Sequence, residues 1–213
     1  MVFPIIHRVP EDKLRSDMER YRQRAIALGA TDAKVITTDK IVIDERVLAK
    51  CNYPKCSGYG TNINCPPYAM SLDQVRKAVS NFRYGILISL KVPPGDTAGT
   101  EAREKNLILP YRRKLAEVTA KIEAEAFYDG YYLAVGFGSG PCKSIFCPDT
   151  DCLALVTGQA CPHRLKARSP MEAVGMDCFA MATNVSWDVY PIGQNTQPSE
   201  VPYGLRLSLV LID

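Results

Sequence analysis

The spacing of apolar residues along the chain predicts several helices. In Glu11–Leu28, apolar side chains recur at steps of three and four, which places them on one face of a helix. Ser71 and Gln74 have the spacing of a capping box and predict the start of another helix. The pattern of Glu101–Phe127 is also helical, but Pro110 predicts a break, with a loop or a separate turn before it.

Two further helices are predicted nearer the end of the chain. Ser169–Glu172 has the capping-box pattern with a proline at the first helical position, and Gly175 is placed to end this helix. Asp177 is placed to cap a second helix that runs toward Trp187.

Four segments have the character of strands because β-branched, aromatic and leucine residues dominate them. They are Lys34–Ile43, Tyr84–Val92, Tyr131–Phe137 and Gly204–Ile212. In the last of these, leucines at every second position define one face. Helices that alternate with strands predict an α/β fold. We expect a single domain, residues 1–213, with a mixed sheet of about four to five strands, flanking helices, and loops between the elements that contain the cysteines.

Composition and charge exclude several classes of protein. The 213 residues include 26 Lys and Arg against 23 Asp and Glu, without a concentrated basic run, so we expect no nucleic-acid or membrane-surface binding. The longest apolar stretches, Tyr84–Leu90 and Leu205–Ile212, fall short of the ~20 residues of a transmembrane helix. Met1–Ile6 lacks the basic start and the length of a signal peptide. We therefore expect a cytoplasmic protein, in a compartment where thiols stay reduced.

Cysteines in a reducing compartment point first to metal ligands, and this chain has eight. The spacing C-x4-C-x8-C occurs twice, at Cys51, Cys56 and Cys65 and at Cys147, Cys152 and Cys161. Both triads end in a Cys-Pro pair. They define a first cysteine loop (residues 51–67) and a second cysteine loop (residues 140–163), and the repeated spacing predicts two similar metal sites.

The second cysteine loop offers an additional thiolate, Cys142, and so supplies the four thiolates that a [4Fe-4S] cluster usually needs. The first loop offers three. Its fourth ligand is left open: Cys178, a thiolate of the other loop, a side chain other than cysteine, or none. Sharing of ligands has precedent in two-cluster ferredoxins, in which the cysteine before proline binds the other cluster.

Zinc and disulfide bonds are the alternatives to iron–sulfur clusters. Structural zinc sites prefer pairs of closely spaced ligands, and the wide gaps here fit that preference poorly. The two histidines, His7 and His163, supply few ligands for a mixed site, and His163 is more typical of a supporting or surface residue. Cys178 has the alternative role of a buried apolar residue in a helix. Asn62 and Asn64 could hydrogen-bond to the metal site or serve as ordinary loop residues.

The ordered set of motifs resembles the DUF2284 family of predicted metal-binding proteins. The motifs are Cys51, Cys56-x-x-Tyr59-Gly60, Cys65-Pro66-Pro67, Gly140-Pro141-Cys142, Cys147, Cys152, Cys161, Arg168–Ala173 and Gly175–Asp177. Two departures are the order Arg168-Ser169-Pro170, where the family has Arg-Pro-Ser, and Cys178, where the family has an aliphatic residue. The resemblance implies metal binding by seven cysteines, in prokaryotes and often in anaerobic ones. It supports neither Cys178 as a ligand nor any particular reaction.

Three functions compete at this point. The sequence lacks a Ser/His/Asp set, a phosphate loop and a nucleotide fingerprint, which favours electron transfer by two clusters to a partner redox protein. A cluster held by three thiolates would keep one iron open, as an enzyme or a metal-centre maturation factor requires. A zinc-stapled structural or binding module is the third reading. A homo-oligomer is compatible with all three.

Overall fold

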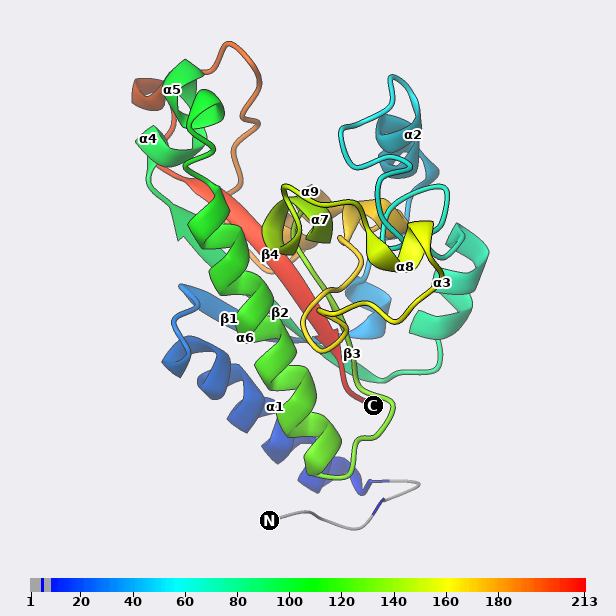
Figure 1. The fold of residues 1–213 in the computed structure, drawn as a ribbon. Helices are drawn as coiled ribbons and strands as arrows, with labels where there is room; N and C mark the ends of the chain where they lie inside the picture. Colours follow the sequence, from blue (N-terminus) through cyan, green and yellow to red (C-terminus); the bar gives the residue numbers. More distant parts are fainter. Residues whose placement is uncertain (1–4, 6–8) are drawn as a thin grey trace.

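The computed structural model describes residue 5 and residues 9–213 (Figure 1). The predictions made for Met1–Ile6, apart from Ile5, and for His7 lie outside the described residues. The α-helices are α1 (Glu11–Ala27), α2 (Glu45–Asn52), α3 (Leu72–Val79), α4 (Pro94–Thr97), α5 (Gly99–Glu104), α6 (Leu109–Tyr128), α7 (Cys142–Phe146), α8 (Leu153–Val156) and α9 (Cys178–Asn184). The strands are β1 (Asp32–Thr37), β2 (Tyr84–Val92), β3 (Val135–Phe137) and β4 (Gly204–Leu211), and short 3₁₀ helices are η1 (Thr38–Lys40), η2 (Glu172–Val174) and η3 (Pro198–Glu200).

The four strands form one sheet in the order β1-β2-β4-β3. Each neighbouring pair runs antiparallel, and Leu209 of β4 lies opposite both Leu87 and Phe137. The α/β class and the flanking helices are confirmed. The direction of the strands differs from the mixed sheet that we expected, because residue patterns locate strands without giving their direction. A parallel pairing does occur outside the strands, at the isolated bridge between Gly138 and Pro170.

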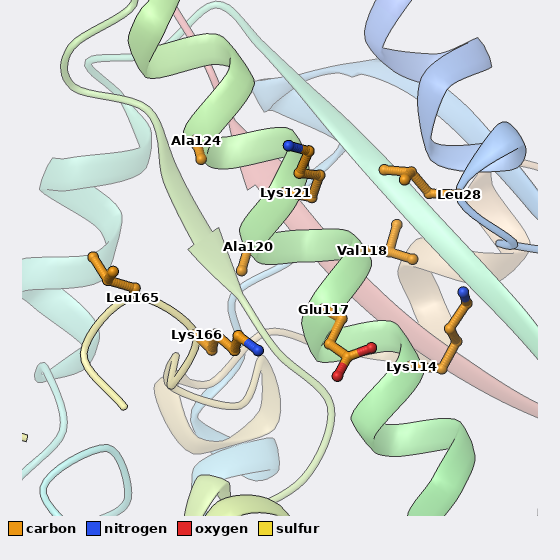
Figure 2. Close-up of a pocket in the computed structure, with 9 residues that line it drawn as sticks. All are labelled: Leu28, Lys114, Glu117, Val118, Ala120, Lys121, Ala124, Leu165 and Lys166. Carbon is orange, nitrogen blue, oxygen red and sulfur yellow. The ribbon is translucent and has the colours of Figure 1, made fainter. Parts of the chain in front are cut away.

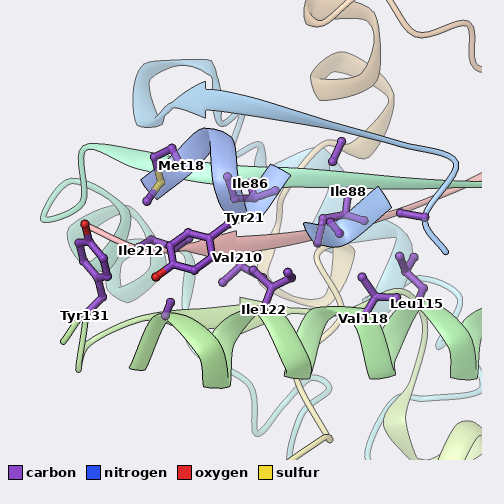
Figure 3. Close-up of a cluster of buried hydrophobic side chains, with 14 of the residues drawn as sticks. Met18, Tyr21, Ile86, Ile88, Leu115, Val118, Ile122, Tyr131, Val210 and Ile212 are labelled. Carbon is purple, nitrogen blue, oxygen red and sulfur yellow. The ribbon is translucent and has the colours of Figure 1, made fainter. Parts of the chain in front are cut away.

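Helices α1 and α6 pack on one face of the sheet, and Figure 3 shows the core between them and the strands. Its largest members alternate along the strands and recur at helical spacing on α6. They include Met18, Tyr21, Ile86, Ile88, Leu115, Val118, Ile122 and Val210. The opposite face packs against α3, η2 and α9. There the leucines at every second position of β4 meet three buried methionines, Met171, Met176 and Met181, as the alternation predicts.

Several predicted elements are confirmed at their ends. Ser71 and Gln74 form the expected capping box at the start of α3. Pro110 lies in the first turn of α6, and the separate helix α5 precedes it, as the predicted break requires. The Asp177 side chain accepts hydrogen bonds from the backbone N–H groups of Phe179 and Ala180 and so caps α9.

Other elements are shorter than predicted or were missed. The predicted helix after Ser169 is only the 3₁₀ turn η2, because the backbone there pairs with Gly138 instead. The predicted strand Lys34–Ile43 ends at Thr37, and the predicted strand Tyr131–Phe137 shrinks to β3. Helix α2, which was not predicted from the sequence, is capped by Asp44.

None of the helices in the described part of the chain combines the length and the apolar character that crossing a bilayer requires.

The core predicts a large loss of stability when Ile122 is truncated. Ile122 is fully buried between α6 and the sheet, so Ile122→Ala is expected to lower the free energy of unfolding by about 2–5 kcal/mol. Leu133→Ala is the matched control because this side chain is 64% exposed, and its expected effect is within about 0.5 kcal/mol. Urea denaturation followed by circular dichroism measures both. Equal effects of the two substitutions would contradict this account of the core.

Candidate metal centre

The seven predicted ligands occupy the ends of short helices and the loops between them. Cys51 lies in the last turn of α2 and not in a loop, whereas Cys56 and Cys65 follow in the loop itself. In the second cysteine loop, the ligands bracket two short helices. Cys142 begins α7, Cys147 follows its end, Cys152 precedes α8 and Cys161 lies in the loop beyond it.

The two cysteine loops pack directly against each other, although they are far apart in sequence. Gly58 of the first loop approaches the second so closely that a Cβ atom placed on it would lie 2.8 Å from Pro141 Cγ. The same atom would lie 3.2 Å from Cys65 Sγ. Only glycine fits at this contact, so the first loop holds Cys65 beside the residue that precedes Cys142.

Two asparagines of the first loop make the polar contacts to the second. The Asn64 side-chain amide donates a hydrogen bond to Cys142 Sγ at 3.3 Å, and the Cys142 thiol donates to Asn62 Oδ1 at 3.5 Å. Asn62 is fully buried and also accepts from the Asn64 backbone N–H. Ser169 Oγ donates to Asn64 Oδ1 at 3.4 Å, which fixes the orientation of that amide. The expected hydrogen bonding of Asn62 and Asn64 therefore reaches the other loop.

Burial dominates the electrostatics of the first-loop thiols. It raises the pKa of Cys65 to about 12 and the pKa of Cys51 to about 11. Neighbouring thiols add to the effect: Cys142 acts on Cys65, and Cys56 acts on Cys51. Without a metal these thiols are therefore protonated at neutral pH, and a bound metal has to displace their protons.

The thiols of the second loop also act on one another. Burial raises the pKa of Cys142, and the hydrogen bond from Asn64 opposes this shift. The three other thiols of the loop lie near enough for their charges to raise it further. The pKa of Cys147 is likewise raised, first by burial and then by Cys161 and Cys152. The ring of His163 stacks on Phe146 at a centroid distance of 5.3 Å, so this histidine joins the two ends of the loop.

Cys178 lies in different surroundings from the other seven. Burial raises its pKa well above the usual value, and the nearby carboxylates of Glu172 and Asp177 raise it further. Glu172 also acts on Cys51, because residues 42–44 pair with residues 175–177 and hold α2 beside η2. The charge of Glu172 therefore acts both on Cys178 and on Cys51 of the first loop.

The donor chemistry of these loops fits a thiolate-bound metal centre. All eight cysteines are free thiols. Among the described residues, no three side chains of Cys, His, Asp or Glu are close enough together to hold a single metal ion. The loops thus supply many soft ligands at separations wider than one ion requires.

A separate groove of about 410 Å³ lies on the outer face of α6 (Figure 2). Its charged side chains are Lys114, Glu117 and Lys121 of α6 and Lys166 from the segment after the second cysteine loop. The described lining contains no cysteine, so this groove is not part of the candidate metal centre.

The family comparison identifies one match. A family model described as a predicted metal-binding protein, DUF2284, matches residues 34–212, which include all eight cysteines. No curated protein and no solved structure matches the chain.

Proposed function

Because the chain belongs to the DUF2284 family of predicted metal-binding proteins, we propose that its cysteines hold two [4Fe-4S] clusters that pass single electrons to a partner redox enzyme. The observation that supports this proposal is the packing of the two cysteine loops against each other, with Asn62 and Asn64 of the first loop in contact with Cys142 of the second. The proposed setting is the cytoplasm, where these thiols would stay reduced and free to bind metal.

The ligands divide unequally between the two loops. The four thiolates of the second loop form a complete set for one cluster, and Cys51, Cys56 and Cys65 hold the other. A single zinc ion binds four sulfur atoms at about 2.3 Å each, which needs thiols already close together. The wider separation of the thiols here favours a cluster, since a cluster spans more space than one ion.

The packing of the loops supports electron transfer between the two sites. A bound [4Fe-4S] cluster supplies one-electron chemistry, and hydrogen bonds to its sulfur ligands tune its reduction potential. Asn64 donates such a hydrogen bond to Cys142, and the thiol of Cys65 also lies near Cys142. The first loop therefore supports the ligands of the second, and the two centres would be neighbours.

A catalytic role at the first loop is the second candidate. Cys178 interacts with Glu172 and Arg206, which favours a first site with three thiolates and one open position. Such a site suits an enzyme or a metal-centre maturation factor, in which substrate or water takes the open position.

Metal analysis tests the proposed clusters. Protein purified without oxygen is expected to contain about eight iron atoms and about eight acid-labile sulfides per chain, as two cubane clusters require. Redox titration is expected to show reversible one-electron steps. Zinc without iron or sulfide would favour the zinc-stapled module and contradict the proposal. Clusters that no donor in the physiological range reduces would contradict electron transfer while leaving the catalytic alternative.

A further inference from the structure

Two arginines near the cysteine loops each have a buried side-chain nitrogen without a hydrogen-bond partner. Arg112 lies on α6 and Arg206 on β4, and the Nε atom of each is buried without a hydrogen-bond partner. Among the described residues, these two are the buried side-chain nitrogen or oxygen atoms left unpartnered. A donor that is buried without a partner destabilises the fold, and more so when it is charged. Because the charge of Arg112 also acts on Arg206, the two groups together place an excess of positive charge in this part of the structure.

The other contacts of the two guanidinium groups are weak. Arg206 Nη2 donates to Thr97 Oγ1 at 3.4 Å, and Arg112 packs over the backbone of Gly140. No acidic residue in the described part of the chain forms an ion pair with either arginine. Burial lowers the pKa of both groups, and the charge of Arg112 lowers that of Arg206 further.

One carboxylate balances this charge in part. The charge of Glu172 acts on both arginines, and it also acts on the Cys178 thiol. Two positive groups thus face one negative group, and one positive charge remains uncompensated. Water can satisfy a lone donor, but it cannot neutralise a partly buried charge.

A cavity of about 100 Å³ lies next to Arg206. Its polar lining comes from Thr97, Ser139, Glu172, Cys178, Tyr190 and Arg206, and Arg112 is not part of it. Since a water molecule takes about 30 Å³ in the liquid, the cavity has room for a small anion but not for a nucleotide. Ser139 and Gly140 run directly into Cys142, so the cavity adjoins the second cysteine loop.

We propose that Arg206 binds a compact oxyanion of the carboxylate, phosphate or sulfate type in this cavity, and that the nearby charge of Arg112 adds to the attraction. Guanidinium groups present several N–H donors in a fixed plane, which matches the oxygens of such anions. The bound anion supplies the missing negative charge and accepts hydrogen bonds from the Arg206 guanidinium. This site is independent of the proposed clusters, and its position beside the second cysteine loop would place a small acidic substrate next to the metal centre.

Isothermal titration of the anaerobically purified protein tests the proposal, with inorganic phosphate, sulfate and acetate as separate probes. At least one of them is expected to bind with one-to-one stoichiometry. The preferred probe identifies the type of oxyanion. If none of the three binds to the unaltered protein, the proposal is wrong, whatever the variants show.

Two variants locate the site. Arg206→Gln is expected to weaken binding on the order of tenfold or more, because it removes the charged donor that lines the cavity. Arg112→Gln is expected to weaken binding less, because it removes a nearby charge and not a direct donor. Arg103→Gln is the matched control: it changes the net charge equally, at an exposed position on α5, and is expected to leave binding unchanged. Equal weakening by all three variants would show a general charge effect and overturn the proposal.

Metal content provides an independent check. The same titration is repeated on metal-loaded and metal-stripped protein, with iron measured in each sample. Binding in the metal-loaded protein supports the proposal. Binding confined to metal-stripped protein would show that the arginines only balance the charge of the thiolate centre, and would overturn it. Failure to find iron would contradict the proposed clusters without affecting the result of the anion titration.

Discussion

Replacing Cys152 with alanine is expected to halve the iron content of the anaerobically purified protein, from about eight to about four atoms per chain. Cys152 is one of the four thiolates of the second cysteine loop, and a cubane cluster that loses a thiolate ligand there loses its attachment. The side chain is half-buried at the start of α8, so its truncation removes a ligand with little loss of packing. Iron and sulfide analysis measures the loss, and electron paramagnetic resonance of the reduced protein shows which signal disappears.

Two further substitutions complete the comparison. Cys56→Ala is expected to remove the other cluster and leave the second loop loaded. Cys178→Ala is the control, because the charges that act on its thiol come from Glu172, Asp177 and Arg206 and not from another cysteine. It is expected to keep all the iron. Loss of one cluster from Cys178→Ala would make Cys178 the fourth ligand of the first site and would refute the open position. Full iron in Cys152→Ala would refute the assignment of the second loop.

The candidate ligands could be predicted from the sequence because their spacing repeats. The C-x4-C-x8-C pattern depends only on local order along the chain, and the additional Cys142 falls in the same segment. The contact between the loops could not be predicted in this way. Asn64 and Cys142 are 78 residues apart, and nothing in either segment specifies the other. The fold brings them together through the pairing of Gly138 with the segment around Pro170.

The burial of Arg112 and Arg206 could not be predicted from the sequence for the same reason. Arg112 appears in the sequence as part of a charged helix face, and Arg206 as a polar position between leucines of β4. Both readings are typical of solvent-exposed side chains. Only the packing of α6 over the sheet reveals that their Nε atoms are buried together. An unpartnered charge of this kind is a property of tertiary structure, which no local pattern can report.

The predicted helices and strands are confirmed where they depend on residues close in sequence, and they differ where tertiary contacts decide the structure. The leucine alternation of β4 and the capping box of α3 are confirmed because each depends on neighbours in sequence. The helix predicted after Ser169 fails because tertiary pairing with Gly138 takes the backbone groups that the helix would need. The predicted strand Lys34–Ile43 is shorter in the structure for a similar reason, because residues 42–44 pair with residues 175–177 instead of extending β1.

Adding one methyl group at Gly58 is expected to reduce the metal content of both loops, although all seven predicted ligands remain. The new Cβ of Gly58→Ala would lie 2.8 Å from Pro141 Cγ and 3.2 Å from Cys65 Sγ. The proline ring is rigid and directly precedes Cys142, so relief of the clash has to move Cys65 or Cys142. Overpacking of this kind costs on the order of 1–3 kcal/mol. Iron and sulfide analysis of the anaerobically purified variant measures the effect on the clusters.

Gly138→Ala is the matched control, since Gly138 lies in the segment that leads into the second cysteine loop. A Cβ there would meet its nearest neighbour, Arg168 O, at 3.8 Å, which is an ordinary van der Waals contact. This variant is expected to keep its iron, because neither loop has to move. The comparison separates a general effect of glycine replacement from a specific effect on the contact between the loops. If Gly58→Ala also keeps all of its iron, the two loops bind metal independently, and the support that the first loop gives to Cys142 is not needed for assembly of the centre.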